Sequence, residues 1–483
     1  MNAQHLNLAR RRFLGRGLAG TAAAFGAGSL ANLLLAARPA YAADYKALVC
    51  VFLYGGNDGM NMITPRDSAR HAQYAGVRGA LALPQASLLA LDGVNYGLHP
   101  AMTALQPAWT AGQLAPVFNV GPLFKPLTKA QLRSLPSSDP AIPDNLFSHS
   151  DQQILWETGS ADSLTRTGWG GRASDTLQTA NPVISVGGNG RFGLSALQAP
   201  LVLPAPGSFF GAHGFSADDL KWAPNAARKS ALDALYSQAA ADAVGNDMID
   251  GYSRQQRDAF EVSARLGGVV GALPGDALSA AGIDAAFATL TVDRKIANPL
   301  AKQLYQVAKL VANNATVRGN RQIFFAQLGG FDTHGQQIGV DALSGHHAGL
   351  MKTLADALAA FNTAMNNLGL GQQVTSFTQS DFGRTLKPNN SSGTDHAWGN
   401  QHLVLGGAVK GGATYGRYPE LVLGGADDVG VDAWELQGRW IPSTSVDQYA
   451  ATLLRWFGAN EGQLDQVLPN LANFGTARGL GFV

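Results

Sequence analysis

The chain has 483 residues, about three times the usual length of a single domain, so one large domain or two ordinary ones are expected. Apolar residues make up 46% of the chain and charged residues only 14%, which excludes intrinsic disorder and a coiled coil, because both need many more charges. The net charge of +1 argues against a nucleic-acid partner, and the single cysteine, Cys50, excludes an intramolecular disulfide.

Residues 1–42 have the composition of an export signal. They contain five arginines and no Lys, Asp or Glu, so taking this +5 from the net +1 leaves −4 for the rest. The segment RRRFL (residues 10–14) precedes a weakly apolar stretch, and AYA (residues 40–42) is a small-x-small cleavage pattern. This order predicts a twin-arginine signal peptide rather than a membrane anchor or an ordinary signal peptide. We therefore expect export by the twin-arginine translocase to the periplasm or medium, with no membrane span in the mature chain, residues 43–483.

The mature chain alternates between apolar runs and glycine-rich polar turns. Residues 45–54 (YKALVCVFLY) form a nearly continuous apolar run, which is typical of a central strand covered on both faces. The remaining predicted elements are strands at 114–120, 322–328, 374–378 and 402–405, a helix over 341–368, and an alanine-rich helical insertion without clear strands at about 210–318. Strands alternating with helices predict an α/β fold with a mostly parallel sheet flanked by helices.

Asp and His residues gather where the predicted strands end. In an open α/β sheet, ligands bind beyond the carboxyl ends of the strands, and Asp and His are the residue types that divalent metals take as ligands. Each short Asp/His cluster alone is an ordinary turn, but together they predict one convergent metal site. The candidate ligands are Asp58, Asp332, His334, Asp381, Asp395, His396 and His402.

Seven motifs spread over nearly all of the mature chain belong together. They are LYGGNDGMN (53–61), SHSDQQILWETG (148–159), GWGGR (168–172), FFAQLGGFDTHGQQ (324–337), TQSDFGRT (378–385), GTDHAWGNQHLVLGGAVKGG (393–412) and SVDQYAATLLRWFG (445–458). In this combination the chain resembles domain-of-unknown-function family 1501, a family of exported, often twin-arginine bacterial proteins. That family is similar to the alkaline phosphatase and sulfatase superfamily, which implies a mostly parallel sheet with Asp and His metal ligands at strand ends.

The resemblance also implies ligand roles for individual residues. It matches Asp58 to an early carboxylate, Asp332 and His334 to a first late pair, Asp381 to the Asp of a strand-end Asp-His pair, and His396 or His402 to the final histidine. Phe382 stands where the histidine of the strand-end pair is expected. One ligand of a two-zinc site is therefore missing, which leaves room for a single metal ion or for none.

Three further residues are candidates for the chemistry itself. Ser148 precedes an amphipathic stretch, so it is either a helix N-cap or a nucleophile beside a helix N-terminus. His149 is a candidate ligand, acid or oxyanion contact. Arg384 either binds an anionic substrate group bidentately or forms a salt bridge with Asp381 or a neighbour.

The function implied is metal-dependent hydrolysis of a phosphate or sulfate ester. The expected cofactor is a divalent metal (Zn, Ca, Mg or Mn), and Ser148 or a metal-bound hydroxide is the expected attacking group. The alternative is a non-catalytic periplasmic binding or assembly protein that has the same fold and an incomplete metal site. A fold does not fix a function, so the choice depends on the site.

Overall fold

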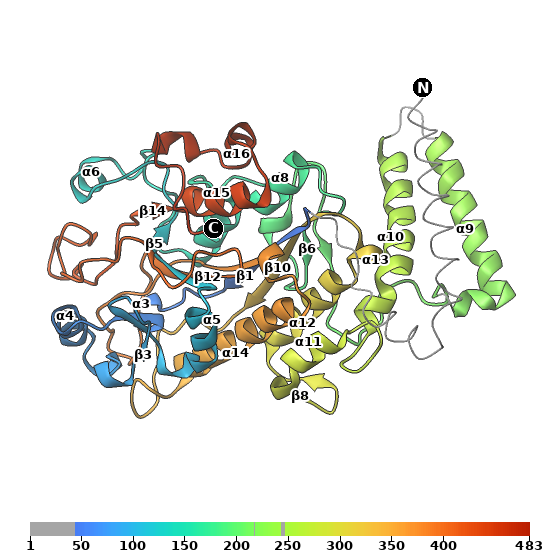
Figure 1. Cartoon of the computed structure of the whole chain (residues 1–483). Coiled ribbons are helices and arrows are strands. Elements are labelled where there is room, and N and C mark those ends of the chain that lie inside the picture. The colour runs from blue at the N-terminus through green and yellow to red at the C-terminus, as the bar shows by residue number, and fades with distance from the viewer. Residues whose placement is uncertain (1–43, 217, 243–246) are drawn as a thin grey trace, which may run out of the picture. The chain divides into compact units, whose positions relative to one another are not determined.

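The described part of the protein contains one large sheet with helices on both faces (Figure 1). The computed structural model describes residues 44–216, 218–242 and 247–483, so the signal peptide predicted for residues 1–42 lies outside the described residues. Within those ranges the sheet has nine strands, which are β1 (Lys46–Leu53), β5 (Leu114–Gly121), β6 (Ile184–Ser185), β7 (Leu201–Val202), β10 (Arg321–Leu328), β11 (Val374–Ser380), β12 (Asn400–Leu405), β13 (Tyr415–Gly416) and β14 (Thr444–Ser445). The predicted α/β class with a mostly parallel sheet is confirmed.

The order of the strands brings three chain segments to one edge of the sheet. The order is β13-β5-β12-β11-β1-β10-β6-β7, and β14 pairs with β5. β12 runs antiparallel to both of its neighbours, and the other pairs are parallel. Leu53 of β1 pairs with Leu328 of β10 and with Ser380 of β11. These three strands therefore end at the same level, and the loops that follow them lie together.

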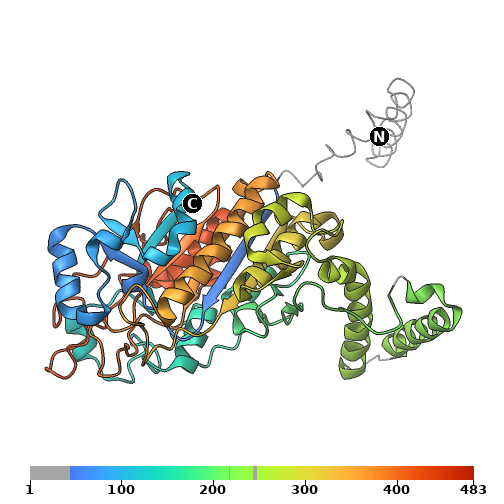
Figure 2. The same ribbon diagram turned by 90° about the horizontal axis from the view of Figure 1, so that it is seen from below.

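Helices bury both faces of the sheet. In Figure 2, α14 (His346–Asn367) and α12 (Pro299–Ala312) lie across one face, and α11 (Ala281–Ala286) packs against both. The other face is covered by α7 (His149–Thr158), α8 (Trp169–Thr176), α15 (Val446–Phe457) and α16 (Glu461–Val467). Leu48, Cys50 and Phe52 of β1 pack into the apolar cluster on this second side. Because β1 is covered on both faces, its sequence is apolar at almost every position.

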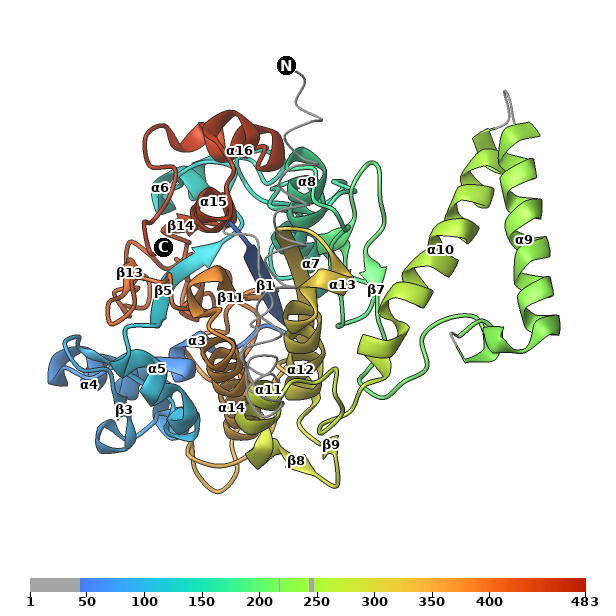
Figure 3. The same ribbon diagram turned by 45° about the vertical axis from the view of Figure 1, so that its right-hand side comes forward.

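Smaller elements complete the described chain. The segment between β1 and α7 also contains four short helices, α3 (Gly59–Met62), α4 (Ser68–Arg78), α5 (Gln106–Thr110) and α6 (Lys129–Ser134). It also forms a three-stranded sheet of β2 (Ile63–Pro65), β3 (Leu89–Ala90) and β4 (Tyr96–Leu98). The region predicted as a helical insertion contains α9 (Ala223–Asp242), α10 (Asp247–Gly271), α13 (Asn314–Val317) and a short hairpin of β8 (Thr291–Val292) and β9 (Lys295–Ile296). Figure 3 shows α9 beside α10. The hairpin was not predicted, because two-residue strands leave no alternating pattern.

None of the helices in the described ranges combines the length and apolar character that crossing a bilayer requires.

Asp447 is a buried carboxyl in the first turn of α15, where its Oδ1 accepts a hydrogen bond from the Asn470 backbone. Burial raises the pKa of Asp447 to about 7. In the unfolded chain the pKa of an aspartate is about 3.9. At a pH between the unfolded and the folded pKa, the folded protein therefore keeps a proton that the unfolded chain has released. The free energy of unfolding is therefore expected to fall between about pH 4 and 7, by up to about 1.4 kcal/mol per pH unit, and to level off above that range.

Asp447→Asn is expected to remove this dependence, because the amide does not titrate. Urea denaturation at pH 5, 6 and 7 measures the slope. Asp432→Asn is the matched control, since Asp432 is exposed. A variant at Asp447 with the wild-type slope would show that another group is responsible.

Candidate functional site

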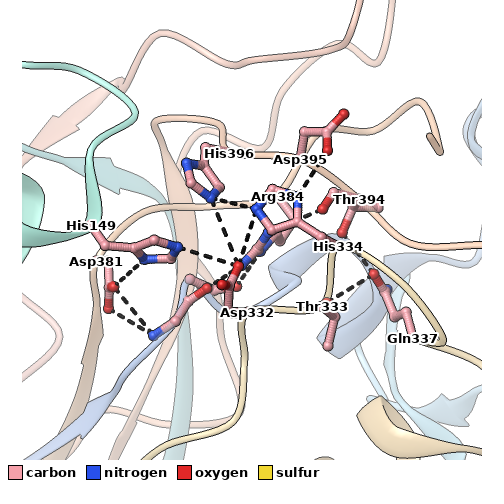
Figure 4. A network of polar contacts seen from close by, with 12 residues as sticks. His149, Asp332, Thr333, His334, Gln337, Asp381, Arg384, Thr394, Asp395 and His396 are labelled. Carbon is pink, nitrogen blue, oxygen red and sulfur yellow. Dashed lines mark hydrogen bonds and ion pairs between the residues drawn. The ribbon is translucent and has the colours of Figure 1, made fainter. Parts of the chain in front are cut away.

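Four side chains meet where β1, β10 and β11 end (Figure 4). They are His149 at the start of α7, Asp332 and His334 in the loop after β10, and His396 shortly before β12. One ligand atom from each residue lies within 4.8 Å of the ligand atoms of the other three. Because β12 is antiparallel, its beginning is at the same edge as the ends of the parallel strands, which explains why His396 joins the group.

Each of the three imidazoles is oriented by a hydrogen bond at its Nδ1 atom. His149 Nδ1 lies 2.8 Å from Asp381 Oδ2, His334 Nδ1 lies 3.0 Å from Asp395 Oδ1, and His396 Nδ1 lies 2.6 Å from the backbone oxygen of Phe147. Carboxylate and carbonyl oxygens only accept hydrogen bonds, so each Nδ1 must carry the proton. In the neutral ring Nε2 then has the free lone pair, which is the arrangement of metal-ligating histidines.

The three Nε2 atoms converge on Asp332. The distance from Asp332 Oδ1 to Nε2 is 3.2 Å for His334, 3.3 Å for His149 and 3.7 Å for His396. In a tetrahedral zinc site with bonds of about 2.0–2.1 Å, neighbouring ligand atoms are about 3.3–3.4 Å apart. His149 Nε2 is also buried without a hydrogen bond among the described residues. The three distances to Asp332 Oδ1 are close to this spacing, so the cluster can hold a divalent ion.

The contact between His334 and His396 needs a positive charge at the cluster. Their Nε2 atoms are 2.7 Å apart. Since both Nδ1 atoms carry protons, two neutral rings would point lone pair at lone pair. Burial lowers the pKa of His396 to about 4, which disfavours a proton on this ring. A proton on His334 Nε2, donated to His396 Nε2, or a cation bound at the cluster would remove the repulsion.

Arg384 fixes the carboxylate of Asp332. Its buried guanidinium donates to Asp332 Oδ1 at 2.6 Å and to the backbone oxygens of Gly55, Gly56 and Thr394. Although burial favours the neutral acid, the hydrogen bond and charge of Arg384 hold the pKa of Asp332 below its usual range. Of the two roles predicted for Arg384, the structure shows the salt bridge, and its partner is Asp332 rather than Asp381.

The backbone at Gly55 packs closely against the loop that carries Asp332. Its N–H lies 3.1 Å from Asp381 Oδ1, and its φ of +113° is in a region that favours glycine. A Cβ at this position would lie 2.4 Å from the backbone nitrogen of Asp332. A residue with a side chain would therefore push the two strand-end loops apart.

A buried glutamine ties the two ligand-bearing loops together. Gln337 Oε1 accepts hydrogen bonds from Thr333 at 3.0 Å and from Thr394 at 2.7 Å (Figure 4). Thr333 stands between Asp332 and His334, and Thr394 precedes Asp395. Gln337 Nε2 donates to Asp58 Oδ2 at 2.5 Å. Gln337 was not identified from the sequence, because a glutamine in a loop carries no pattern that marks it as buried.

Gln337→Leu is expected to weaken metal affinity about 10-fold or more, within the range seen when groups that orient ligands are removed. The change deletes the bridge between the loops while keeping a side chain of similar size. Metal affinity is measured by competition with a chelating dye on samples shown by circular dichroism to be fully folded, so that a loss of stability does not contribute. The control is Gln336→Asn, at an exposed neighbour whose φ of +52° suits asparagine. Unchanged affinity in Gln337→Leu would contradict the positioning role.

Asp58 does not join the cluster. It caps α3 through the Asn61 backbone and forms a fully buried ion pair with Arg78 of α4. Although burial opposes ionisation, the charge of Arg78 holds the pKa of Asp58 below its usual range. Both of its carboxylate oxygens accept hydrogen bonds from the protein, so Asp58 holds the amide of Gln337 in place and offers no free ligand atom.

His402 is also separate from the four residues. Its ring lies between Trp156 and Tyr449, at centroid distances of 4.7 and 5.9 Å, and Nδ1 is 3.3 Å from the Thr378 hydroxyl. Burial lowers the pKa of His402 to about 3. Of the two histidines proposed as the final ligand, the structure therefore brings His396 and not His402 to the cluster.

The remaining predicted residues surround the four. Asp381 and Asp395 hold His149 and His334 by Nδ1, as described above. Ser148 is at the N-cap position of α7 but makes no capping hydrogen bond, and its hydroxyl donates to Asp151 at 2.6 Å. Phe382 packs its ring against His149 and His396, at centroid distances of 4.7 and 4.6 Å. Among the described residues, the cluster of His149, Asp332, His334 and His396 is the single group with the geometry of a metal site.

Comparisons with known proteins show the family of this chain. A search of curated proteins finds no match. A solved structure described as "Crystal structure of Ps i-CgsB in complex with k-i-k-neocarrahexaose" aligns with 89% of this chain and 77% of its own chain, at 11% identity and a TM-score of 0.33, which is too low to support an argument. Residues 45–431 match the family described as "Protein of unknown function (DUF1501)". This match covers most of the sequence, so the chain belongs to the DUF1501 family.

Proposed function

We propose that this protein is a hydrolase of phosphate or sulfate esters that uses one divalent metal ion. The observation that carries the proposal is the convergence of three Nε2 atoms and Asp332 Oδ1 on one point, with each imidazole held by Nδ1. The similarity to the alkaline phosphatase and sulfatase superfamily, proposed from the sequence motifs, supplies the reaction class. The position of the cluster at the carboxyl ends of parallel strands agrees with where such folds bind ligands.

Each residue has a role that follows from its contacts. His149, His334, His396 and Asp332 would hold the ion, and Asp381, Asp395 and Arg384 orient them. When bound, a divalent ion polarises the ester and lowers the pKa of a coordinated water. Ser148, one residue before His149, or a water molecule is the attacking group. The anionic part of the ester is expected to bind at this cluster, because a divalent ion outweighs the single carboxylate among its ligands.

Phe382 and Asp58 favour one ion over two. The ring of Phe382 fills the place next to His149 and His396, and Asp58 is occupied by Arg78. The same two residues support a second candidate function, a non-catalytic binding or assembly protein that uses the ion as a structural or ligand-binding centre.

The experiment combines elemental analysis with an ester panel. Protein purified after export is analysed for divalent metals, and phosphate and sulfate monoesters and diesters are tested with His334→Ala as the control. The hydrolase predicts about one ion per chain and hydrolysis of one ester class that the variant loses. One ion without any hydrolysis supports the binding protein, and trace metal alone contradicts both candidates.

We propose export through the twin-arginine pathway as the route to the periplasm or medium. The support is the RRRFL segment and the absence of lysine and acidic residues from residues 1–42. Changing both Arg10 and Arg11 to lysine keeps the charge but is expected to keep the protein in the cytoplasm, because the two side chains are not interchangeable where the guanidinium is recognised. Cell fractionation measures the outcome, and export of the double variant at the wild-type level would contradict the proposal.

A further inference from the structure

A polar cavity of about 380 Å³ lies beside the ligand cluster. It is formed by the end of β1, one face of α7, the loop 187–191 and β10. Its volume is within the range of about 300–1,000 Å³ that small-molecule sites occupy. The side chains that determine its chemistry are Tyr54, Gln153, Glu157, Asn189, Arg191 and Gln327.

Gln153 connects this cavity to the metal ligands. Its Nε2 donates to Asp381 Oδ2 at 2.8 Å, and the same oxygen is 2.8 Å from His149 Nδ1. Gln153 is also four residues after His149 on α7, so both lie on the same side of the helix. The side chain of Gln153 is therefore two hydrogen bonds away from His149, a proposed ligand of the ion.

The lining offers amide groups that no described residue uses. The side chains of Asn189 and Gln327 have no hydrogen-bond partner within the described part of the chain, and Gln153 donates only through its nitrogen. Each primary amide presents two donors and one acceptor with two lone pairs. Such groups match hydroxyls, each of which both donates and accepts.

The two charged residues of the cavity are of opposite sign and are anchored. Glu157 accepts from the Tyr54 hydroxyl at 2.5 Å and from the Phe192 backbone at 2.8 Å. Arg191 donates to the Thr165 backbone oxygen at 2.8 Å. The lining therefore carries no net charge that would select an ionic group, in contrast to the proposed ion beside it.

We propose that this cavity binds the alcohol part of the substrate and that this part is an uncharged, polyhydroxylated group of the carbohydrate type. The inference rests on the proposed function, which makes the bound molecule a substrate, but the binding site itself is defined by the free side-chain amides of Asn189 and Gln327 and the free amide oxygen of Gln153. The ester anion would lie at the ion, and the hydroxylated group would extend toward α7 and the loop 187–191.

Direct binding tests the cavity without any reaction. Metal-loaded protein is titrated calorimetrically with methyl glucoside, methyl galactoside and methyl mannoside, and with cyclohexanol as a ring that carries one hydroxyl. At least one glycoside is expected to bind saturably and cyclohexanol is not. Asn189→Ala combined with Gln327→Ala is expected to weaken binding about 10-fold, as removing two hydrogen bonds would. Gln198→Ala, in an exposed loop outside the cavity, is the matched control and should bind normally.

Two results would overturn the proposal. One is that no glycoside of the panel binds, and the other is that the double variant binds as tightly as the wild type. Repeating the titration with His334→Ala separates the two proposals, because the cavity does not include His334. If His334→Ala still binds the glycoside and the wild-type protein hydrolyses no ester, the cavity proposal is supported and the hydrolase proposal is contradicted. Hydrolysis of methyl phosphate or methyl sulfate without glycoside binding does the reverse.

Discussion

Replacing His334 with alanine is expected to lower the affinity for a divalent ion by more than about 100-fold, beyond the 10–100-fold effect of losing a group that only orients a ligand. His334 is central to the cluster, because its Nε2 is 3.2 Å from Asp332 Oδ1 and 2.7 Å from His396 Nε2. The change removes one of four ligands and also leaves Asp395 without the imidazole that it orients. Elemental analysis and competition with a chelating dye measure the loss.

The stability of the ion-free protein separates this effect from misfolding. The His334 side chain is 46% exposed, so its removal is expected to change the free energy of unfolding in chelator by no more than about 0.5 kcal/mol. His346→Ala is the matched control, since this exposed histidine bonds the Gly330 backbone oxygen outside the cluster. Wild-type metal affinity in His334→Ala would show that the ion does not bind here.

Asp58→Asn is expected to lower the free energy of unfolding by about 3–5 kcal/mol, because it leaves the guanidinium of Arg78 buried without a counter-charge. Asp58 and Arg78 have no exposed side-chain surface. Urea denaturation of the metal-free protein measures the effect. Asp67→Asn is the control, because it breaks a partly exposed ion pair with Arg70 that is worth about 0–1 kcal/mol.

The same experiment decides between two roles of Asp58. As the partner of Arg78 it destabilises the protein when changed, with or without metal. A normal free energy of unfolding combined with lost metal affinity would instead make Asp58 a ligand. The double change Asp58→Leu with Arg78→Met is expected to recover much of the stability, since an apolar pair leaves no charge buried alone.

The central strands could be predicted because their pattern is local. β1 and β10 are apolar at most positions, since helices cover both faces of the sheet. Strands of two residues, such as β6 and β13, left no pattern and were missed. The helix predicted from residue 341 begins at His346, after Gly345 with a φ of +98°.

Part of the site could be predicted from strand ends alone. Asp332 and His334 follow β10, and His396 precedes β12, so topology was sufficient to bring them together. Asp58 follows β1 in the same way, yet the chain turns into α3 and the carboxylate meets Arg78 20 residues later. Gln337 was not predicted, because its importance comes from Thr333 in its own loop and from Thr394 and Asp58 in two other loops.

The sequence by itself determined the α/β class and the residue types available at one edge of the sheet. Hydrophobic periodicity depends on neighbours along the chain, so it can be recognised without coordinates. The tertiary structure alone decided which of these side chains converge. Whether an Asp becomes a ligand, like Asp332, or half of a buried ion pair, like Asp58, depends on a partner distant in sequence, and packing chooses that partner.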